Sequence, residues 1–470
     1  MSRLVCVSNR ISLPRKSAAP GGLAIGIQSA LRRSGGLWFG WSGDTSEEDA
    51  DDPDIHIRDG VSFATIDIRK QDFDDYYNGY ANEVLWPLFH YFQRSMRYKD
   101  EQRDAYESVN RTFAQKLAPL LEQEDVIWVH DYHLIPLGRQ LRELGVQRPI
   151  GFFLHIPFPN IEMLRVLPSY AELLRDLTCY DVVGFQTQND LNAFYSCIEH
   201  LFGAEAIRGE GRIRVGERVL RAAVFPIGVD VNGVQTEATE AQSASVVKRM
   251  SDSLMGRDLM MGVDRLDYSK GLVERFSAYQ TFLETYPDNV GRITYIQIAP
   301  LSRADVKAYV EIRQSLEQAA GRTNGRFADT DWTPIRYLNR NFPHATLMGF
   351  LRAADVGLVT PLRDGMNLVA KEFVAAQDAS DPGVLVLSNL AGAARELTSA
   401  LLVNPYDMRG VSHAIQAALS MPLPERRERH AAMLQVLKRN DIASWTRRFV
   451  EALEQAQSSD ARMRAVSNRA

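Results

Sequence analysis

Short, almost continuous apolar segments recur along this chain, separated by longer stretches with helical periodicity. Each segment is only a few residues long, which suits a strand buried on both faces of a sheet. Such strands, alternating with helices, are typical of parallel, doubly wound α/β sheets. The segments are residues 4–7, 126–129, 150–155, 182–185, 222–227, 260–263, 293–298, 354–359 and 384–387.

The length of the chain predicts more than one domain. It has 470 residues, and a single hydrophobic core rarely organises so many. A polar stretch at 231–244 lies between the strand patterns at 222–227 and 260–263. We therefore expect two α/β domains of similar size, residues 1–230 and 231–444.

The charge balance argues against a nucleic-acid partner. Lysine and arginine total 54, aspartate and glutamate total 59, and the net charge is -5. The chain thus lacks the basic field that attracts phosphate backbones. Its 45% apolar and 24% charged residues are ordinary for a globular enzyme.

The cysteines and the apolar runs indicate the compartment. Cys6, Cys179 and Cys197 lack the paired spacing of a zinc site or a disulfide framework, which favours a reducing environment. The apolar run at 4–7 is too short for a signal sequence, and no run approaches the length that crosses a membrane. We expect a cytoplasmic protein with no membrane partner.

Polar residues at 363–372 lie where the strand pattern at 354–359 turns into a helix. Doubly wound sheets bind ligands at such edges, and a helix N-terminus there favours phosphate oxygens. If the helix begins near Asn367, Lys371 and Glu372 stand in its first turn, within reach of a bound anion or hydroxyl group. An ordinary turn with a solvated Lys–Glu pair is the competing interpretation.

Cations follow two other strand patterns in the second half. Arg265 and Lys270 flank a turn after residues 260–263, and Arg303 follows residues 293–298. Two cations beside a helix start can hold a diphosphate without a metal ion. We therefore expect an anion-binding edge on this sheet.

The first half carries a weaker anion signal. Arg10 follows the first strand pattern, and Gly22 belongs to a glycine pair that precedes a helical pattern. Paired glycines let a ligand approach the backbone closely, and the following N–H groups favour an anion. A plain glycine turn and a solvated arginine are the alternatives.

Polar side chains also follow the strand patterns at 126–129 and 150–155. Asp131 lies between His130 and His133, and His155 ends the next pattern. Two histidines and an aspartate could indicate a metal site. We favour Asp131 as an acceptor for a substrate hydroxyl, and a purely structural role is the alternative for His155.

An aromatic cluster in the first half suits the apolar face of a sugar ring. Core packing is the alternative for each of its members. Tyr77 and Trp86 are the preferred candidates, because the sequence around Tyr77 is too polar for a simple core segment. The cluster comprises Trp38, Trp41, Tyr76, Tyr77, Tyr80 and Trp86.

Together these motifs resemble the trehalose-6-phosphate synthases, glycosyltransferase family 20, over almost the whole chain to about residue 450. The resemblance implies a GT-B fold, α/β with two facing Rossmann-like domains and the active site in the cleft between them. It implies that a helix near 445–458 completes the first domain. The stretches that carry it are residues 7–10, 21–24, 38–41, 76–78, 85–87, 130–133, 155–159, 264–271 and 363–372.

The resemblance also implies the substrates. The acceptor would be glucose 6-phosphate, bound by the first domain, and the donor a nucleotide-glucose, most often UDP-glucose, bound by the second. Residues that match the family's acceptor contacts are Arg10, Tyr77, Trp86, Asp131 and Arg303. Those that match its donor contacts are Gly22, Arg265, Lys270, Phe342, Asp364, Met366, Asn367, Leu368, Val369 and Glu372.

Within the donor set the resemblance implies separate roles. Main-chain N–H groups of Leu368 and Val369 would face the diphosphate, Glu372 the ribose and Phe342 the nucleobase. Asp364 and His155 would contact hydroxyls of the donor glucose.

The implied reaction retains the anomeric configuration and uses no metal ion and no cofactor. The departing phosphate would take the proton of the acceptor, which attacks from the same face. The residues expected to carry catalysis are Asp131, His155, Arg265, Lys270 and Asp364.

Two other functions remain open from the sequence. One is a pseudo-glycosyltransferase that acts on cyclitols, and the other is a non-catalytic regulatory subunit. The intact donor and acceptor sets favour the synthase. The donor base, uracil, adenine or guanine, is left open, and we expect a homodimer or homotetramer.

Overall fold

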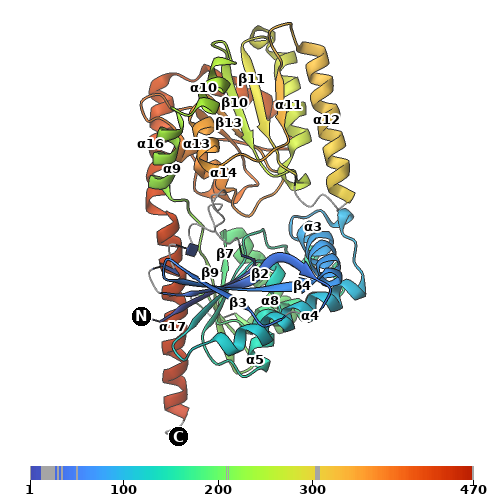
Figure 1. Ribbon diagram of the computed structural model, residues 1–470, viewed down its shortest axis with the longest axis vertical. Helices are drawn as coiled ribbons and strands as arrows, with labels where there is room; N and C mark the ends of the chain where they lie inside the picture. Colours follow the sequence, from blue (N-terminus) through green and yellow to red (C-terminus); the bar gives the residue numbers. More distant parts are fainter. Residues whose placement is uncertain are drawn as a thin grey trace. The chain divides into compact units, whose positions relative to one another are not determined.

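The computed structural model describes residues 2–11, 27–28, 31–32, 35–48, 51–207, 209, 211–301 and 307–467. The chain forms two compact units. The first comprises Met1–Ile227 and Ala443–Ala470, and the second comprises Gly228–Ile442. Each unit is built on its own sheet (Figure 1).

The first unit contains a nine-stranded sheet in the order β3-β4-β2-β1-β5-β6-β7-β9-β8. Its strands run parallel except for β3 beside β4 and β8 beside β9. Because β1 lies between β2 and β5, the strand order reverses at the β1–β5 pair. The strands are β1 (Leu4–Arg10), β2 (Leu37–Ser46), β3 (Asp54–Arg58), β4 (Val61–Arg69), β5 (Val126–His130), β6 (Ile150–Phe153), β7 (Val182–Phe185), β8 (Arg212–Val215) and β9 (Arg218–Val224).

Helices connect these strands. The longest of them before β9 are α4 and α8, and a π-helix precedes α3. Thr187 and Asp190 form a capping box that starts α8. The helices are α2 (Lys70–Asp72), the π-helix η1 (Phe73–Leu85), α3 (Trp86–Phe89), α4 (Asp100–Leu117), α5 (Leu137–Glu143), α6 (Ile161–Leu164), α7 (Tyr170–Leu177), α8 (Gln188–Phe202) and the short 3-10 turns η2 (Gln93–Ser95), η3 (Ala118–Leu120), η4 (Tyr132–Leu134) and η5 (Ala204–Ala206).

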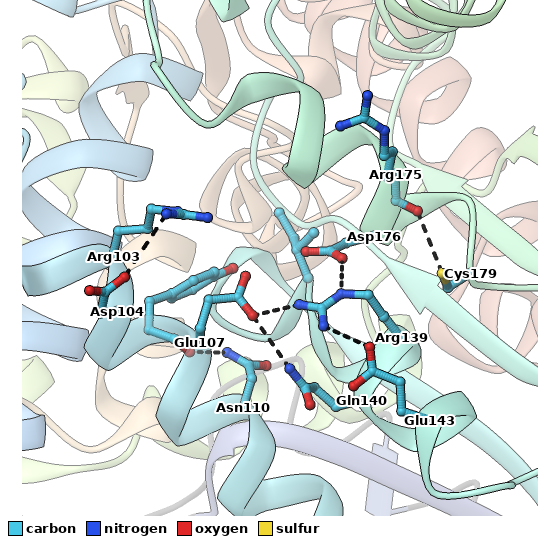
Figure 2. A network of polar contacts seen from close by, with 12 residues as sticks. Arg103, Asp104, Glu107, Asn110, Arg139, Gln140, Glu143, Arg175, Asp176 and Cys179 are labelled. Carbon is cyan, nitrogen blue, oxygen red and sulfur yellow. Dashed lines mark hydrogen bonds and ion pairs between the residues drawn. The ribbon is translucent and has the colours of Figure 1, made fainter. Parts of the chain in front are cut away.

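One arginine ties together three of these helices. Arg139 of α5 donates to Asp176 of α7 and to Glu107 of α4, each at 2.5 Å, and to Glu143 at 3.0 Å (Figure 2). Three carboxylates thus share one guanidinium. Burial raises the pKa of Asp176 to about 7 even though Arg139 opposes the shift.

The last helix, α17 (Ile442–Ser467), packs on the first unit's sheet. Its Phe449 stacks on Trp128 of β5 with ring centroids 4.5 Å apart. Gly151 of β6 and Gly184 of β7 make room for this ring, because a Cβ at either would lie 2.7 Å from it.

The second unit contains a six-stranded parallel sheet in the order β12-β11-β10-β13-β14-β15. Renumbered within the unit this is 3-2-1-4-5-6, the strand order of Rossmann sheets, with the reversal at the β10–β13 pair. The strands are β10 (Asp258–Val263), β11 (Ile293–Ile298), β12 (Ile335–Leu338), β13 (Val356–Val359), β14 (Val384–Ser388) and β15 (Leu401–Val403).

The helices of the second unit form two packed groups. Helices α9, α13 and α14 contact one another, and α11 contacts α12 and α15. The second group shares an apolar core with the sheet, which includes Phe276 and Tyr279. The helices are α9 (Val231–Ala241), α10 (Ser245–Asp252), α11 (Leu272–Thr285), α12 (Lys307–Phe327), α13 (His344–Arg352), α14 (Leu368–Ala376), α15 (Met408–Ser420), α16 (Leu423–Arg439) and the 3-10 turns η6 (Tyr268–Lys270), η7 (Pro287–Asn289) and η8 (Gly392–Arg395).

Every apolar segment predicted as a strand overlaps one, although at 222–227 the strand β9 ends at Val224, so the α/β prediction is confirmed. Six further strands, β2, β3, β4, β8, β12 and β15, were not predicted. Among them, β3 is exposed along its whole length, because it lies at the edge of its sheet and needs no apolar run. The polar stretch at the expected boundary is largely helical, as α9.

Candidate active site

Strand order determines where ligands can bind in the second unit. Ligands of doubly wound sheets lie beyond the carboxyl ends of the strands where the order reverses. In this sheet those ends belong to β10 and β13. The segments that follow them carry Arg265 and Lys270 in one case and Asp364 in the other.

The structure brings Lys270 and Asp364 into direct contact. Lys270 Nζ donates to Asp364 Oδ2 at 2.5 Å, although 94 residues separate the two. Asn367 Nδ2 donates to the same oxygen at 3.1 Å. A cation, a carboxylate and a helix start therefore meet at one place, with both charged side chains largely buried.

The helix predicted to begin near Asn367 is confirmed as α14. Asn367 adopts a left-handed conformation with φ 75°, and its side chain accepts a hydrogen bond from the N–H of Ala370 at 3.1 Å. Leu368 and Val369 are the first residues of the helix and are half-buried. Met366 is buried, and its carbonyl oxygen accepts from the N–H of Ala393.

The prediction for Lys371 is wrong. This side chain is fully buried, and its Nζ donates to Glu396 Oε2 at 2.5 Å. Glu396 also accepts from Asn440 Nδ2 through its other oxygen. A lysine held in this way anchors α14 in the protein interior, so it is not a ligand for an anion at the helix start.

Glu372 is close to a histidine that the sequence analysis missed. His344 Nε2 forms an ion pair with Glu372 Oε1 at 3.5 Å, and His344 Nδ1 lies 2.7 Å from Glu237 Oε2. The neighbouring carboxylates of Glu372 and Glu237 raise the pKa of His344 to about 9 despite burial. His344 is therefore a cation at neutral pH.

Arg275 was also missed. Its guanidinium is buried and donates to Asp264 at 2.6 Å, to Gln297 at 2.9 Å and to the carbonyl oxygen of Lys270 at 3.2 Å. It thereby fixes the turn after β10, on which Arg265 is exposed. The spacing of Asp264 and Arg275 in the sequence forms no motif that would have revealed Arg275 as a residue of the site.

Phe342 lies just before α13 and is half-buried. The guanidinium of Arg340 lies 4.4 Å from the centre of its ring, and Phe350 contacts the ring edge-on. One aromatic face is thus already covered by a cation.

In the first unit the strand order reverses at β1 and β5, whose ends carry Arg10 and Asp131. Arg10 is exposed, and its guanidinium lies 5.6 Å from the ring centre of Trp41. Gly43 leaves room for it, because a Cβ there would lie 2.5 Å from Arg10 Nε.

The backbone of Asp131 is strained. Its φ of 75° and ψ of 165° fall in a region that glycine occupies and side chains disfavour. Asp131 Oδ1 accepts from the N–H of His155 at 3.2 Å, which ties the end of β5 to the end of β6. Strain of this kind is common at functional sites.

His130 and His155 form a neutral pair. His130 Nδ1 lies 3.1 Å from His155 Nε2. Burial lowers the pKa of His155 to about 3 and that of His130 well below its usual range. The Nε2 atom of His130 is buried with no hydrogen-bond partner among the described residues, so the proton of His130 belongs on Nδ1, where it has an acceptor. This arrangement favours a His155 proton on Nδ1.

The two preferred aromatics differ in exposure. Tyr77 is half-buried on the π-helix η1 and stacks on His133 with centroids 5.7 Å apart. Trp86, the next residue after η1, is 96% buried and packs on His90 and Tyr132. The other four members of the cluster are all buried in the core: Trp38, Trp41, Tyr76 and Tyr80.

Two candidate residues, Gly22 and Arg303, lie outside the described residues. Within the described part of the chain, no three His, Cys, Asp or Glu side chains converge as metal ligands. None of the helices in that part combines the length and the apolar character needed to cross a membrane.

Comparison with known proteins adds a full-length similarity. The family model described as glycosyltransferase family 20 matches residues 5–455. A curated relative from Klebsiella pneumoniae, named trehalose-6-phosphate synthase, is 50% identical over 99% of this chain and 98% of its own.

Two solved structures were determined with ligands. A Burkholderia xenovorans α,α-trehalose-phosphate synthase (UDP-forming) in complex with glucose 6-phosphate is 47% identical, with a TM-score of 0.92 over 96% of this chain and 100% of its own. An Escherichia coli protein bound with UDP-2-fluoro glucose is 48% identical, with a TM-score of 0.92 over 97% and 99%.

Proposed function

The chain belongs to glycosyltransferase family 20, and from this premise we propose that it transfers glucose from UDP-glucose to glucose 6-phosphate. The products are α,α-trehalose 6-phosphate and UDP. The observation that carries the proposal is the contact of Lys270 with Asp364 at the point where the Rossmann sheet reverses. A sugar diphosphate needs a cation for its phosphate directly beside a hydroxyl acceptor for its sugar, and this pair supplies both.

For the donor, Arg265 and Lys270 would neutralise the diphosphate, together with the N–H groups of Leu368 and Val369 at the positive end of α14. Asp364 would accept from glucose hydroxyls, and Glu372 from the ribose. The contact of Lys270 with Asp364 would loosen when the β-phosphate arrives. Phe342 would line the nucleobase, with its other face on Arg340.

For the acceptor, Arg10 would bind the phosphate, with Arg303 as a second cation. Asp131 would accept from the sugar hydroxyls, with Tyr77 and Trp86 against the ring. A proton on His155 Nδ1 would equip this residue to donate to a hydroxyl of the donor glucose.

We propose the bond changes that the resemblance to the family implies. The acceptor hydroxyl oxygen bonds to the anomeric carbon as the bond from that carbon to the β-phosphate oxygen breaks. The hydroxyl proton goes to the departing phosphate, on the same face, so the configuration is retained. The main demand on the protein is to stabilise negative charge on the leaving phosphate, which Lys270, Arg265 and α14 would meet.

The alternatives are less well supported. The relatives carry the name trehalose-6-phosphate synthase, which favours glucose 6-phosphate over a cyclitol acceptor. A non-catalytic subunit predicts loss of donor residues, whereas Arg265, Lys270, Asp364 and Glu372 are all present.

A donor panel tests the proposal. UDP-, ADP- and GDP-glucose are each supplied with glucose 6-phosphate, and kcat/KM is measured by coupled nucleotide release. We expect UDP-glucose to give the highest value. Absence of product with every donor would refute the proposed function.

We further propose that the protein works in the cytoplasm as a homodimer or homotetramer. Sedimentation equilibrium of the purified chain measures the mass in solution. A mass equal to that of one chain at all concentrations would exclude the oligomer.

A further inference from the structure

His344 occupies an unusual place between two acidic side chains from different helices. It is the first residue of α13, whereas Glu237 belongs to α9 and Glu372 to α14. Its Nδ1 lies 2.7 Å from Glu237 Oε2, and its Nε2 lies 3.5 Å from Glu372 Oε1. The three helices pack together, so one imidazole links all of them.

The ring is held as a cation by these two carboxylates. Its side chain is 13% exposed, and burial alone would favour the neutral form. Glu372 and Glu237, the titratable groups that face it, outweigh burial and raise its pKa to about 9. Both nitrogens therefore carry protons at neutral pH, and each can be directed at one carboxylate.

We propose that His344 is a positioning residue for the donor, which holds Glu372 in the orientation that accepts hydrogen bonds from the ribose hydroxyls. The inference rests on the role proposed above for Glu372. Glu372 is buried in the first turns of α14, and a partner that fixes its side-chain rotamer before binding reduces the entropy cost of the ligand contact. His344 restrains one oxygen of Glu372, and the second remains for the ribose.

The arrangement is asymmetric in a way that supports this role. The shorter contact, to Glu237, fixes the ring from α9. The longer contact, to Glu372, reaches α14, the helix whose first residues match the donor site. If His344 served only to join α9 to α13, its contact with Glu237 would be enough, and the contact with Glu372 would not be needed.

The test compares nucleotides that differ only in the ribose. Inhibition constants of UDP and 2′,3′-dideoxy-UDP are measured against the donor, together with kcat and both KM values. The variants are His344→Ala, His344→Arg, which keeps a cation, and His413→Ala, a control at an exposed histidine of the same unit. Thermal unfolding of each variant is followed in parallel.

We expect wild type and His413→Ala to bind UDP more tightly than the dideoxy nucleotide. In His344→Ala the preference should fall to less than about twofold and the donor KM should rise about tenfold, which corresponds to the loss of one charged hydrogen bond. The acceptor KM should not change, and His344→Arg should recover most of the preference. Adding His344→Ala to Glu372→Gln should then have little further effect.

If His344→Ala lowers the melting temperature but retains the preference for UDP, the histidine is only structural and the inference fails while the proposed function stands. If wild type makes no trehalose 6-phosphate and binds neither nucleotide, both fail.

Discussion

At the scale of single residues, the central feature is the contact between Lys270 and Asp364. We expect Lys270→Ala to lower kcat by about 100-fold or more, because the variant lacks the cation that we propose for the leaving phosphate. Lys248→Ala, at an exposed lysine of α10, is the matched control and should leave kcat unchanged. Steady-state kinetics with UDP-glucose measures both. Equal rates for the two variants would exclude Lys270 from catalysis.

We expect substitutions of Asp131 to change the stability of the protein and its activity in different ways. Its φ of 75° is costly for any residue with a Cβ, whereas glycine adopts it freely. Asp131→Gly should therefore be more stable than Asp131→Ala by about 1 kcal/mol, and both should lose activity with glucose 6-phosphate. Urea unfolding measures the difference. A more stable alanine variant would mean that the backbone relaxes at this position.

Sequence patterns located the residues at strand ends but not the partners that hold them. The sequence places Lys371 near the anion-binding helix start, but a pattern does not reveal that this face of α14 meets Glu396. His344 was missed because Glu237, 107 residues earlier, supplies half of its environment. Arg275 was missed for the same reason, since Asp264 and Gln297 meet it only in the folded sheet.

At the scale of elements, α17 completes the core of the first unit. Phe449 fills the space above two strand glycines and stacks on Trp128. Phe449→Ala should lower the free energy of unfolding of this unit by about 3–5 kcal/mol, as for other large cavities. Glu451→Ala, at an exposed position of α17, is the control. Similar unfolding midpoints for the two variants would show that α17 does not stabilise the sheet.

The network around Arg139 should make stability depend on pH (Figure 2). The pKa of Asp176 rises from 3.8 to about 7 on folding, so the proton favours the folded state. That contribution is complete below about pH 4 and is lost as the pH rises through 7. The stability of Asp176→Asn relative to wild type should therefore increase between pH 5 and 8. A constant difference, measured by urea unfolding at each pH, would contradict this.

The elements themselves were predictable where burial is complete. Strands such as β5 and β13 are buried along their length and give continuous apolar runs. Strands β3 and β8 lie at sheet edges and carry exposed polar residues, so their sequences resemble loops.

At the scale of the whole molecule, we propose that the first unit binds the acceptor and the second unit binds the donor. Asp131→Ala should then weaken glucose 6-phosphate binding without changing the affinity for UDP, and Lys270→Ala should do the reverse. Isothermal titration calorimetry measures each affinity directly. Loss of both affinities in either variant would contradict this division.

The proposed function is the synthesis of one disaccharide. NMR analysis identifies the product that the protein forms from UDP-glucose and glucose 6-phosphate, and Lys270→Ala, with its lower kcat, should form the same product more slowly. We predict α,α-trehalose 6-phosphate, with the donor's anomeric configuration retained and no metal ion required. Free glucose, a product of inverted configuration or no product at all would contradict the account.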